Sequence, residues 1–366
     1  MSTVLYVAGA RPNFMKVAAI LKAAAGAPFG SELVHSGQHY DFEMSGVFFD
    51  ELGIPPPVVH LQIGSASHGV QTGRVMAAFE EYVAARGEPP RGIVVVGDVN
   101  STMACALVGV KLGIPVAHVE AGLRSFDRTM PEEINRVVTD AVSDLLLVSE
   151  PAGLTNLERE GVAPARVAYV GNVMIDTLVD QLAAARALDV AAGMQLAPRG
   201  YAVVTLHRPS NVDVPVRLTA LARLLANLAT KLAVVFPVHP RTLAKLRELQ
   251  LEPMLTGAGI RLLAPLGYRE FVGLIDDARL VVTDSGGIQE ETTFLGIPCI
   301  TLRSNTERPI TMTMGTNRLV GDDLAVAMAE IDAIIAGPTE RRTCAIDGWD
   351  GHAAERVVTE LGRRWV

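Results

Sequence analysis

The sequence lacks the features of a disulfide-stabilised or zinc-binding protein. Its 366 residues include only three cysteines, Cys105, Cys299 and Cys344. Their number is odd, their spacing is wide and no CxxC pair occurs, which argues against a disulfide framework and against a metal site. Cys105 and Cys299 stand in apolar surroundings, so we expect both to be buried and reduced.

Long apolar runs are also absent. No apolar stretch reaches the roughly 18 residues that a membrane span needs. The apolar segment 4–8 is short, has no basic region before it and runs directly into GARPNF, which is unlike a signal peptide. We therefore expect a cytoplasmic protein that has no membrane partner.

An excess of basic residues is missing as well. The 32 basic and 40 acidic residues give a net charge of −8, which argues against a nucleic-acid partner, because such a partner needs a basic face. A small phosphorylated ligand stays compatible with this charge, since a few arginines and backbone N–H groups can hold one. Hydrophobic residues make up 49% of the chain, as in an ordinary globular protein.

Short β-branched runs alternate with helical patterns in two successive series, which predicts βαβ units and parallel sheets. We predict an α/β protein of two Rossmann-like, doubly wound domains that face a cleft. The domains are expected at 1–170 and 171–350, with the helix 351–366 packing back on the first. In open parallel sheets ligands bind at the carboxyl ends of the strands, and the motifs described next all follow predicted strands.

The segment Thr283-Asp284-Ser285-Gly286-Gly287 gives the sharpest local signal. An apolar strand ends there, small residues turn the chain and a helix is predicted at Gln289–Phe294. The first N–H groups of a helix lack partners within the helix and attract a phosphate. The alternative is an ordinary strand-to-helix turn with Ser285 as N-cap, and the segment alone does not decide between the two.

The loop Gly9–Lys16 follows the first predicted strand. It does not read GxGxxG, so the dinucleotide fingerprint is absent. It places Arg11 at a strand end, where a guanidinium could clamp a diphosphate. For the loop taken alone, a solvated arginine is the favoured interpretation.

Carboxylates follow two apolar strands of the first half, at Asp98 and at Glu120. A charge at such a place must be desolvated, paired or used. Glu132 and Glu133 open a predicted helix, where acids usually complement the helix dipole. Several carboxylates near one cleft could act as general acid and base.

Histidines follow the first two strands of the second half. His207 could protonate or steady a leaving group, although a lone histidine is more often bonded to the backbone. His239 ends the next strand and favours a polar cleft. These residue types suit an anionic, nucleotide-linked ligand and do not name a reaction.

Taken together, the motifs resemble the non-hydrolysing UDP-N-acetylglucosamine 2-epimerase family. The matching segments are GARPNFMK, SGQHYD, VGDVNSTMA, IPVAHVEAGLRS, MPEEINR, GNVMIDTL, TLHRPSNV, PVHPRT, TDSGGIQEE, LGIPC, NTERP and GTNRLVG. The resemblance implies the glycosyltransferase-B type of fold and a homodimer. It also implies interconversion of UDP-N-acetylglucosamine and UDP-N-acetylmannosamine, through a 2-acetamidoglucal, without a nicotinamide cofactor or a metal.

The resemblance also implies roles for single residues. Asp98, Glu120 and Glu132 match the catalytic acids of the family and His207 its catalytic histidine, and Asp98 is our choice for handling the C2 proton. The residues that match the UDP-binding set are Arg11, Lys16, Phe271, Ser285, Gly286, Gly287 and Glu291. Within this set, the Ser285 turn and Arg11 would hold the diphosphate, Glu291 the ribose and Phe271 the uracil, while Lys16 would lie near the acids.

Two alternatives stay open at this point. Epimerases of UDP-diacetamido-uronic acids share most of these motifs, and glycosyltransferases can use the same architecture. The stretch 40–45 departs from the allosterically activated bacterial members, so we expect activation by a second UDP-N-acetylglucosamine to be absent or altered.

Overall fold

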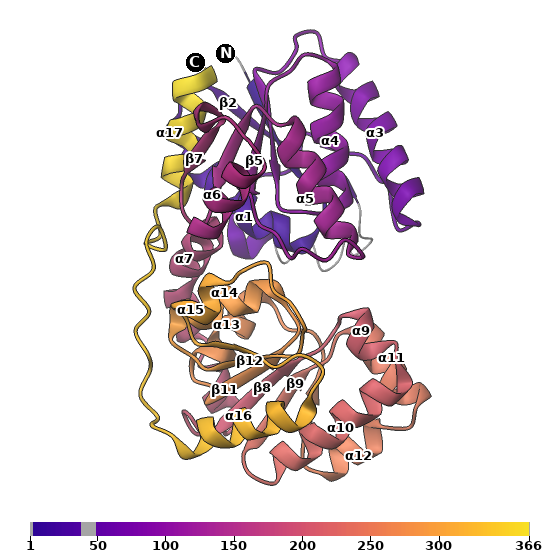
Figure 1. Ribbon diagram of the computed structural model, residues 1–366, viewed down its shortest axis with the longest axis vertical. Helices are drawn as coiled ribbons and strands as arrows, with labels where there is room; N and C mark the ends of the chain where they lie inside the picture. Colours follow the sequence, from indigo (N-terminus) through magenta and orange to yellow (C-terminus); the bar gives the residue numbers. More distant parts are fainter. Residues whose placement is uncertain (1–2, 38–48, 366) are drawn as a thin grey trace. The chain divides into compact units, whose positions relative to one another are not determined.

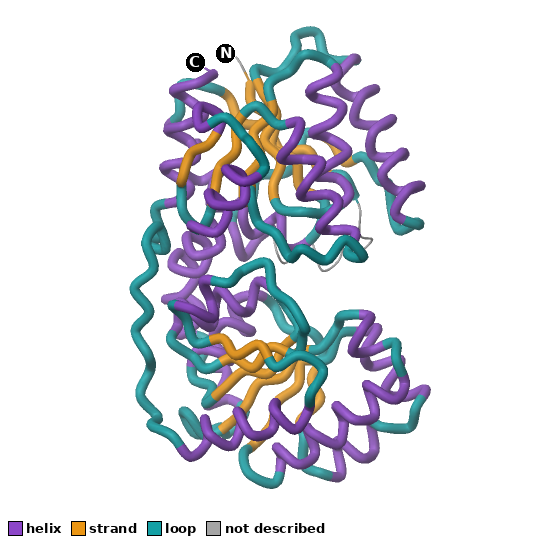
Figure 2. Tube along the Cα trace, viewed as in Figure 1, coloured by secondary structure: helices purple, strands orange, loops and turns teal. Residues whose placement is uncertain are grey.

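The computed structural model describes residues 3–37 and 49–365 (Figure 1). These residues fall into two compact units: unit 1 comprises 1–180 with 347–366, and unit 2 comprises 181–346. Each unit is a parallel sheet with helices on its two faces (Figure 2). The prediction of two Rossmann-like α/β domains is confirmed.

Unit 1 contains a seven-stranded sheet in the order β3-β2-β1-β4-β5-β6-β7, with every neighbouring pair parallel. The strands are β1 (Thr3–Ala8), β2 (Gly30–His35), β3 (Val59–His60), β4 (Gly92–Val96), β5 (Val116–Ala121), β6 (Leu145–Val148) and β7 (Val167–Tyr169). The helices are α1 (Arg11–Ala23), α3 (His68–Ala84), α4 (Asn100–Lys111), α5 (Pro131–Val142), α6 (Pro151–Arg159), α7 (Val173–Ala187) and α17 (Ala353–Trp365).

The central strands of unit 1 are apolar on both faces, as a sheet covered by helices on both sides requires. All five residues of β4 are buried. Leu5 and Val7 face the core formed with α3 and α4, where Phe79 and Cys105 are fully buried. On the other face α1 packs against α17. Gly92 is needed at the start of β4, because a Cβ there would lie 2.4 Å from the Trp365 ring of α17.

Unit 2 contains a six-stranded parallel sheet in the order β10-β9-β8-β11-β12-β13. The strands are β8 (Tyr201–Thr205), β9 (Ala233–Pro237), β10 (Arg261–Leu263), β11 (Leu280–Thr283), β12 (Cys299–Thr301) and β13 (Asn317–Leu319). The helices are α8 (Val190–Gly193), α9 (Pro209–Val212), α10 (Pro215–Ala229), α11 (Pro240–Glu248), α12 (Glu252–Gly257), α13 (Tyr268–Asp276), α14 (Gly286–Leu295), α15 (Ile310–Thr313) and α16 (Leu324–Ala336). Its largest core lies between the sheet and α10, α12 and α16.

The units divide within α7, ten residues after the predicted boundary at 170. The first half of α7 is tied to unit 1, because Thr177 Oγ1 donates to the Met15 carbonyl at 2.6 Å and the Asp176 carboxylate accepts the N–H of Ala353 at 3.1 Å. The second half is tied to unit 2 through Arg186, whose Nε donates to Asp276 at 2.8 Å. A single continuous helix hides this division from the sequence pattern.

Two predicted loops are shorter in the structure. The segment Gly9–Lys16 was expected to be a loop, but α1 already begins at Arg11, because Pro12 suits a first helical turn. Likewise α14 begins at Gly286 and not at Gln289. Both helices therefore start almost directly after their strands. No helix in the described ranges is both long enough and apolar enough to cross a membrane.

Candidate active site

The carboxyl ends of β4 and β5 bring the turn that carries Asp98 next to Glu120, which are two of the predicted acids of unit 1. After β4 the chain turns at Gly97, which has a φ of +70° that favours glycine. A Cβ on Gly97 would lie 3.2 Å from Asn13 Nδ2, 3.4 Å from Glu120 Oε2 and 3.6 Å from Lys16 Nζ. The turn that carries Asp98 thus packs directly against Glu120 and Lys16.

Glu120 occupies a strained position at the end of β5. Its φ is +71°, which is costly for a residue with a side chain, and the register between β5 and β6 shifts at this residue. The carboxylate is buried and forms an ion pair with the buried ammonium of Lys16. The bulge re-aims this side chain relative to a regular strand, a device that is frequent beside active sites.

Asp98 is the more accessible acid. Its side chain is 31% exposed and pairs with Arg136 of α5, which is itself buried. Arg136 Nη2 also donates to Glu133 at 2.7 Å, so one guanidinium joins the two carboxylates. An acid that is held by a fixed cation and still reaches solvent can accept a proton from a ligand.

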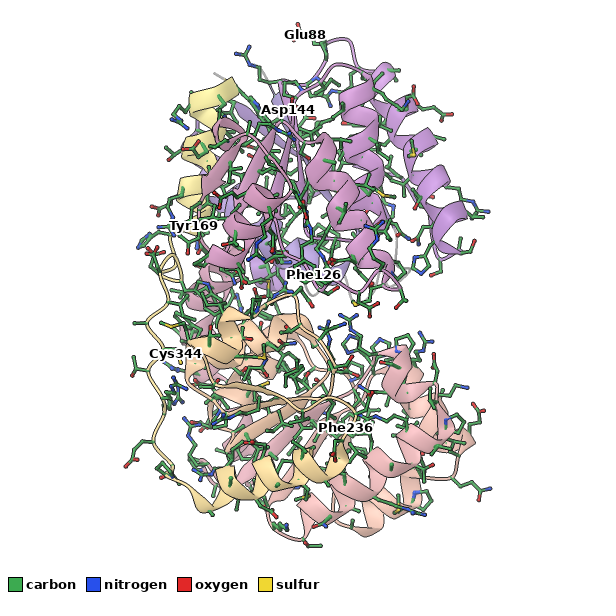
Figure 3. All side chains as sticks on the ribbon, in the orientation of Figure 1. Glu88, Phe126, Asp144, Tyr169, Phe236 and Cys344 are labelled. Atoms are coloured by element: carbon green, nitrogen blue, oxygen red, sulfur yellow. The ribbon has the colours of Figure 1, made fainter. Side chains whose placement is uncertain are left out.

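Glu133 is a structural partner of this arrangement. Its carboxylate accepts the N–H groups of Ser125 at 2.9 Å and of Phe126 at 3.0 Å. Burial alone would raise the pKa of Glu133, but these N–H groups and Arg136 outweigh burial, so the net pKa lies below its ordinary value. Glu133 thereby anchors the loop that presents Phe126, a ring that is 73% exposed (Figure 3).

Glu132 differs from its neighbour Glu133 in its surroundings. It is partly exposed at the first turn of α5, and none of the residues in the described ranges forms a hydrogen bond or ion pair with its carboxylate. The carboxylate of Glu133, on the same turn, is already bound by Arg136 and by the Ser125 N–H. Of the two acids that open α5, Glu132 is therefore the one that can meet a ligand.

In unit 2 the Ser285 turn leads from β11 into α14. The Ser285 side chain does not cap the helix, and its hydroxyl is partly exposed. Gly286 is required by close packing, because a Cβ there would lie 2.6 Å from Glu307 Oε1 and 3.2 Å from Arg308 Nη1. The first N–H groups of α14 lack partners within the helix, which is the arrangement that binds a phosphate.

His207 follows β8 and is held by Asp284, the residue after β11. His207 Nδ1 lies 2.9 Å from Asp284 Oδ1, and the His207 ring is 41% exposed while Asp284 is fully buried. The Asp284 carboxylate also accepts the N–H of Arg208 at 3.0 Å. Burial alone would raise the pKa of Asp284, but the bonds from His207 and these N–H groups outweigh burial, and the net pKa is lowered.

The other residues of the predicted UDP-binding set lie on two adjacent helices or outside the described part. Glu291 is buried on α14 and Phe271 is half buried on α13, and these helices contact each other. Arg11 begins α1, but its side chain lies outside the described residues, as does the stretch 40–45. Lys16 is placed at Glu120, beside the acids.

Sequence reasoning missed two residues that organise these sites. Arg136 orients Asp98, and its place three residues after Glu133 on one helix was a signal that could have revealed the ion pair. Asp284 orients His207 from a distant strand, and nothing in the local sequence distinguishes that role. The described residues contain no group of three or more histidines, cysteines or acids that could hold a metal ion.

Comparison with known proteins identifies the relatives of this chain. Residues 22–362 match the family model described as UDP-N-acetylglucosamine 2-epimerase. The UDP-N-acetylglucosamine 2-epimerase of Methanocaldococcus jannaschii is 38% identical over 97% of each chain. The UDP-2,3-diacetamido-2,3-dideoxy-D-glucuronate 2-epimerase of Pseudomonas aeruginosa is 42% identical over 87% of this chain and 88% of that protein.

Solved structures agree with these matches. The crystal structure of M. jannaschii UDP-GlcNAc 2-epimerase in complex with UDP-GlcNAc and UDP has a TM-score of 0.89 and covers 99% of each chain. A UDP-glucosyltransferase from Polygonum tinctorium, 15% identical, has a TM-score of 0.61 over 100% of this chain and 98% of that one, which shows a shared fold alone. The glycosyltransferase-B type of fold is thereby confirmed.

Proposed function

Because this chain belongs to the UDP-N-acetylglucosamine 2-epimerase family, we propose that it interconverts UDP-N-acetylglucosamine and UDP-N-acetylmannosamine without hydrolysis. The observation that carries the proposal is the position of Asp98 directly after Gly97, the residue that packs against the Glu120–Lys16 ion pair. This turn supplies acid and base groups at the end of a parallel sheet, where ligands of such folds bind.

The proposed reaction is an anti elimination followed by re-addition. A base removes the C2 hydrogen as a proton, the C–H electron pair forms the C1=C2 double bond, and the C1–O bond breaks with its electrons leaving on UDP. A proton then returns to the opposite face of C2 of the 2-acetamidoglucal, and UDP adds back to C1. Because the C2 hydrogen is only weakly acidic, cleavage of the C1–O bond must be ahead of cleavage of the C2–H bond. Positive groups near the diphosphate favour the departure of UDP.

The roles of the acids follow from their surroundings. Asp98 is proposed to handle the C2 proton, because it is paired with Arg136 and still partly exposed. Glu120 and Glu132 are the further acid/base candidates, since inversion needs groups that reach both faces of the sugar. Glu120 forms an ion pair with Lys16, while Glu132 is partly exposed on α5.

UDP is proposed to bind through unit 2. The start of α14 with Ser285, Gly286 and Gly287 would receive the diphosphate, and His207, held by Asp284, would steady the charge on the leaving group. Glu291 would bind the ribose and Phe271 would lie beside the uracil. Arg11 is proposed to contribute a further positive charge to the diphosphate.

A second candidate substrate is a UDP-diacetamido-uronic acid. The 42% identity with the P. aeruginosa 2-epimerase of such a sugar favours this alternative. The elimination chemistry at C1 and C2 would be the same, so the two candidates differ in the groups that contact C3 and C6.

The two substrates are distinguished by one experiment in deuterated water. Purified protein is incubated separately with each UDP-sugar and followed by proton NMR. We expect UDP-N-acetylglucosamine to acquire deuterium at C2 and to form the manno isomer, without an added acceptor. Exchange with the uronic acid alone would transfer the assignment to the second candidate. Release of free N-acetylmannosamine and UDP would indicate a hydrolysing enzyme, and no exchange with either sugar would overturn the proposal.

The assembly state and the cellular location are also proposals. We infer from the family resemblance that the protein works as a homodimer in the cytoplasm. Size-exclusion chromatography with light scattering tests the first statement, since a dimer has twice the mass of the 38.9 kDa chain.

A further inference from the structure

Behind the Gly97 turn lies a cluster of four charged side chains, the 118–160 cluster: His118, Asp140, Arg124 and Glu160. Asp140 Oδ1 is 2.6 Å from His118 Nδ1, and Asp140 Oδ2 is 2.7 Å from Arg124 Nη1. Arg124 makes two further bonds of 2.8 and 2.7 Å to the two oxygens of Glu160. The first three side chains are 0–1% exposed, and only Glu160 reaches the surface.

The partners of the His118 ring define its protonation. Nε2 lies 2.7 Å from the Gly97 carbonyl oxygen, which can only accept, so Nε2 carries a proton. Asp140 is held as the carboxylate by donors other than His118, because its Oδ2 lies 2.7 Å from the Arg124 guanidinium and accepts the N–H of Gly122 at 3.0 Å. An ionised Asp140 also only accepts, so Nδ1 carries a proton as well.

The charge balance of the cluster agrees with this assignment. With a proton on both ring nitrogens, His118 and Arg124 are the two cations, and Asp140 and Glu160 are the two anions. Buried charges are tolerated when they are paired and hydrogen-bonded.

The cluster is bonded to the backbone on which both proposed acids stand. Asp140 Oδ2 accepts the N–H of Gly122 at 3.0 Å, while its other oxygen binds His118. Asp140 thus binds the residues two positions before and two positions after Glu120, the residue with a φ of +71°. His118 also binds the carbonyl of Gly97, the residue directly before Asp98.

We propose that His118 is a doubly protonated positioning residue that, together with Asp140, fixes the backbone of Gly97–Asp98 and of Glu120 for proton transfer. The inference rests on the proposed function in so far as Asp98 and Glu120 act on the substrate. His118 is fully buried and acts through the Gly97 carbonyl, so it is not itself a catalytic residue. A displacement of about 1 Å in an acid or base can lower a rate about 100-fold.

The protonation of His118 is tested first, without any substrate. The full chain is labelled with ¹⁵N-histidine, and the ring nitrogens are observed by NMR at pH 7, with the His118 signals assigned by their loss in H118Q. We expect both nitrogens of His118 to show the protonated shift. His352 is the reference, because it pairs with Glu355 at 3.3 Å but is exposed. The split shifts of a neutral ring at His118 would overturn the proposal, whatever the enzyme does.

The positioning role is tested with two substitutions that separate the ring nitrogens. In H118Q the amide nitrogen falls near the place of Nε2 and keeps the bond to Gly97, whereas in H118N it falls near Nδ1 and keeps the bond to Asp140. We expect kcat to fall about 100-fold in H118N and about 10-fold in H118Q, with KM and the Kd for UDP nearly unchanged. The control H352Q should keep the activity of the parent protein.

The outcomes separate the inference from the proposed function. A parent protein that turns over UDP-sugar, with H118N equally active, would overturn the positioning role. Equal losses of kcat in the two variants would overturn it too, since only a difference between them assigns the Gly97 bond. A parent protein that is inactive on every UDP-sugar would count against the proposed function and leave the NMR result to decide the protonation. If one variant does not fold, the other supplies both the assignment of the His118 signals and the kcat comparison with H352Q, and parental kcat in that variant would overturn the positioning role.

Discussion

Unit 1 and unit 2 place an aspartate at equivalent points of their sheets, but the surroundings of the two side chains differ. β4 lies beside β1 in unit 1, and β11 lies beside β8 in unit 2. Asp98 follows β4 and is 31% exposed with one ion pair to Arg136. Asp284 follows β11, is fully buried and is bonded to His207, Arg208 and Asn211.

The same strand end can therefore keep an acid accessible or enclose it. In unit 1 the acid at the strand end stays open, while a buried arginine fixes it. In unit 2 the acid is enclosed and serves to orient an exposed histidine, while the helix start beside it offers N–H groups to an anion. We therefore propose that proton transfer takes place in unit 1 and that the start of α14 in unit 2 receives the diphosphate of UDP.

The largest expected effect is that of D98N in unit 1. The amide cannot accept a proton at neutral pH, so we expect kcat for epimerisation to fall by about 100- to 10,000-fold. The Kd for UDP, measured by calorimetry, should stay close to that of the parent protein. The exposed acid Glu88 gives the control E88Q, which should be fully active. Parental kcat in D98N would remove Asp98 from the mechanism.

The matching substitution in unit 2, D284N, is expected to act mainly on stability. The new amide places a donor among the groups that donate to the buried Asp284 carboxylate, and a buried polar group left unsatisfied costs about 1–3 kcal/mol of the free energy of unfolding, which denaturant titration measures. Asp213 provides the control, because its pair with Arg241 is partly exposed and D213N should cost at most about 1 kcal/mol. Equal losses in the two variants would show that burial does not distinguish the two aspartates.

A smaller effect is expected for G286A at the start of α14. The new Cβ would lie 2.6 Å from Glu307 Oε1, so the paired Glu307 side chain or the helix start must shift, and we expect the Kd for UDP to rise about 10-fold, which is about 1.4 kcal/mol. G257A is the control, since nothing lies within 4 Å of a Cβ at that helical position of the same unit. Unchanged UDP affinity in G286A would place the diphosphate elsewhere.

The smallest effect concerns pH. The pKa of Asp284 is lowered from its ordinary 3.8, so its ionised form stabilises the folded protein above that value, and this contribution is lost as pH falls through the lower folded pKa. The difference in unfolding free energy between the parent protein and D284N should therefore shrink from about pH 5 to about pH 2. A difference that stays constant over this range would contradict the pairing.

The sequence predicts most of the frame because its signals are local. Apolar runs predict strands such as β4, and the turn residues Ser285 to Gly287 predict the start of a helix at the right place to within three residues. The apolar runs also predict that Asp98 follows a strand and that Glu120 stands at the end of one. All of these signals lie within a few residues along the chain.

What escapes the sequence depends on contacts between distant segments. Asp98 and Asp284 have the same local pattern, an acid after an apolar strand, and only Arg136 from α5 and Asn211 from α9 make their surroundings different. The positive φ of Glu120 coincides with the shift in register between β5 and β6. The division within α7 is set by the separate partners of its two halves.

The division of tasks between the units is tested most directly by amide hydrogen exchange with and without UDP, read by mass spectrometry. The account predicts that UDP protects the N–H groups at the start of α14, in the segment 285–289 of unit 2. A much smaller change is expected at the turn 97–100 of unit 1, since UDP lacks the N-acetylhexosamine on which Asp98 would act. Protection of the 97–100 turn with none at 285–289 would contradict the account.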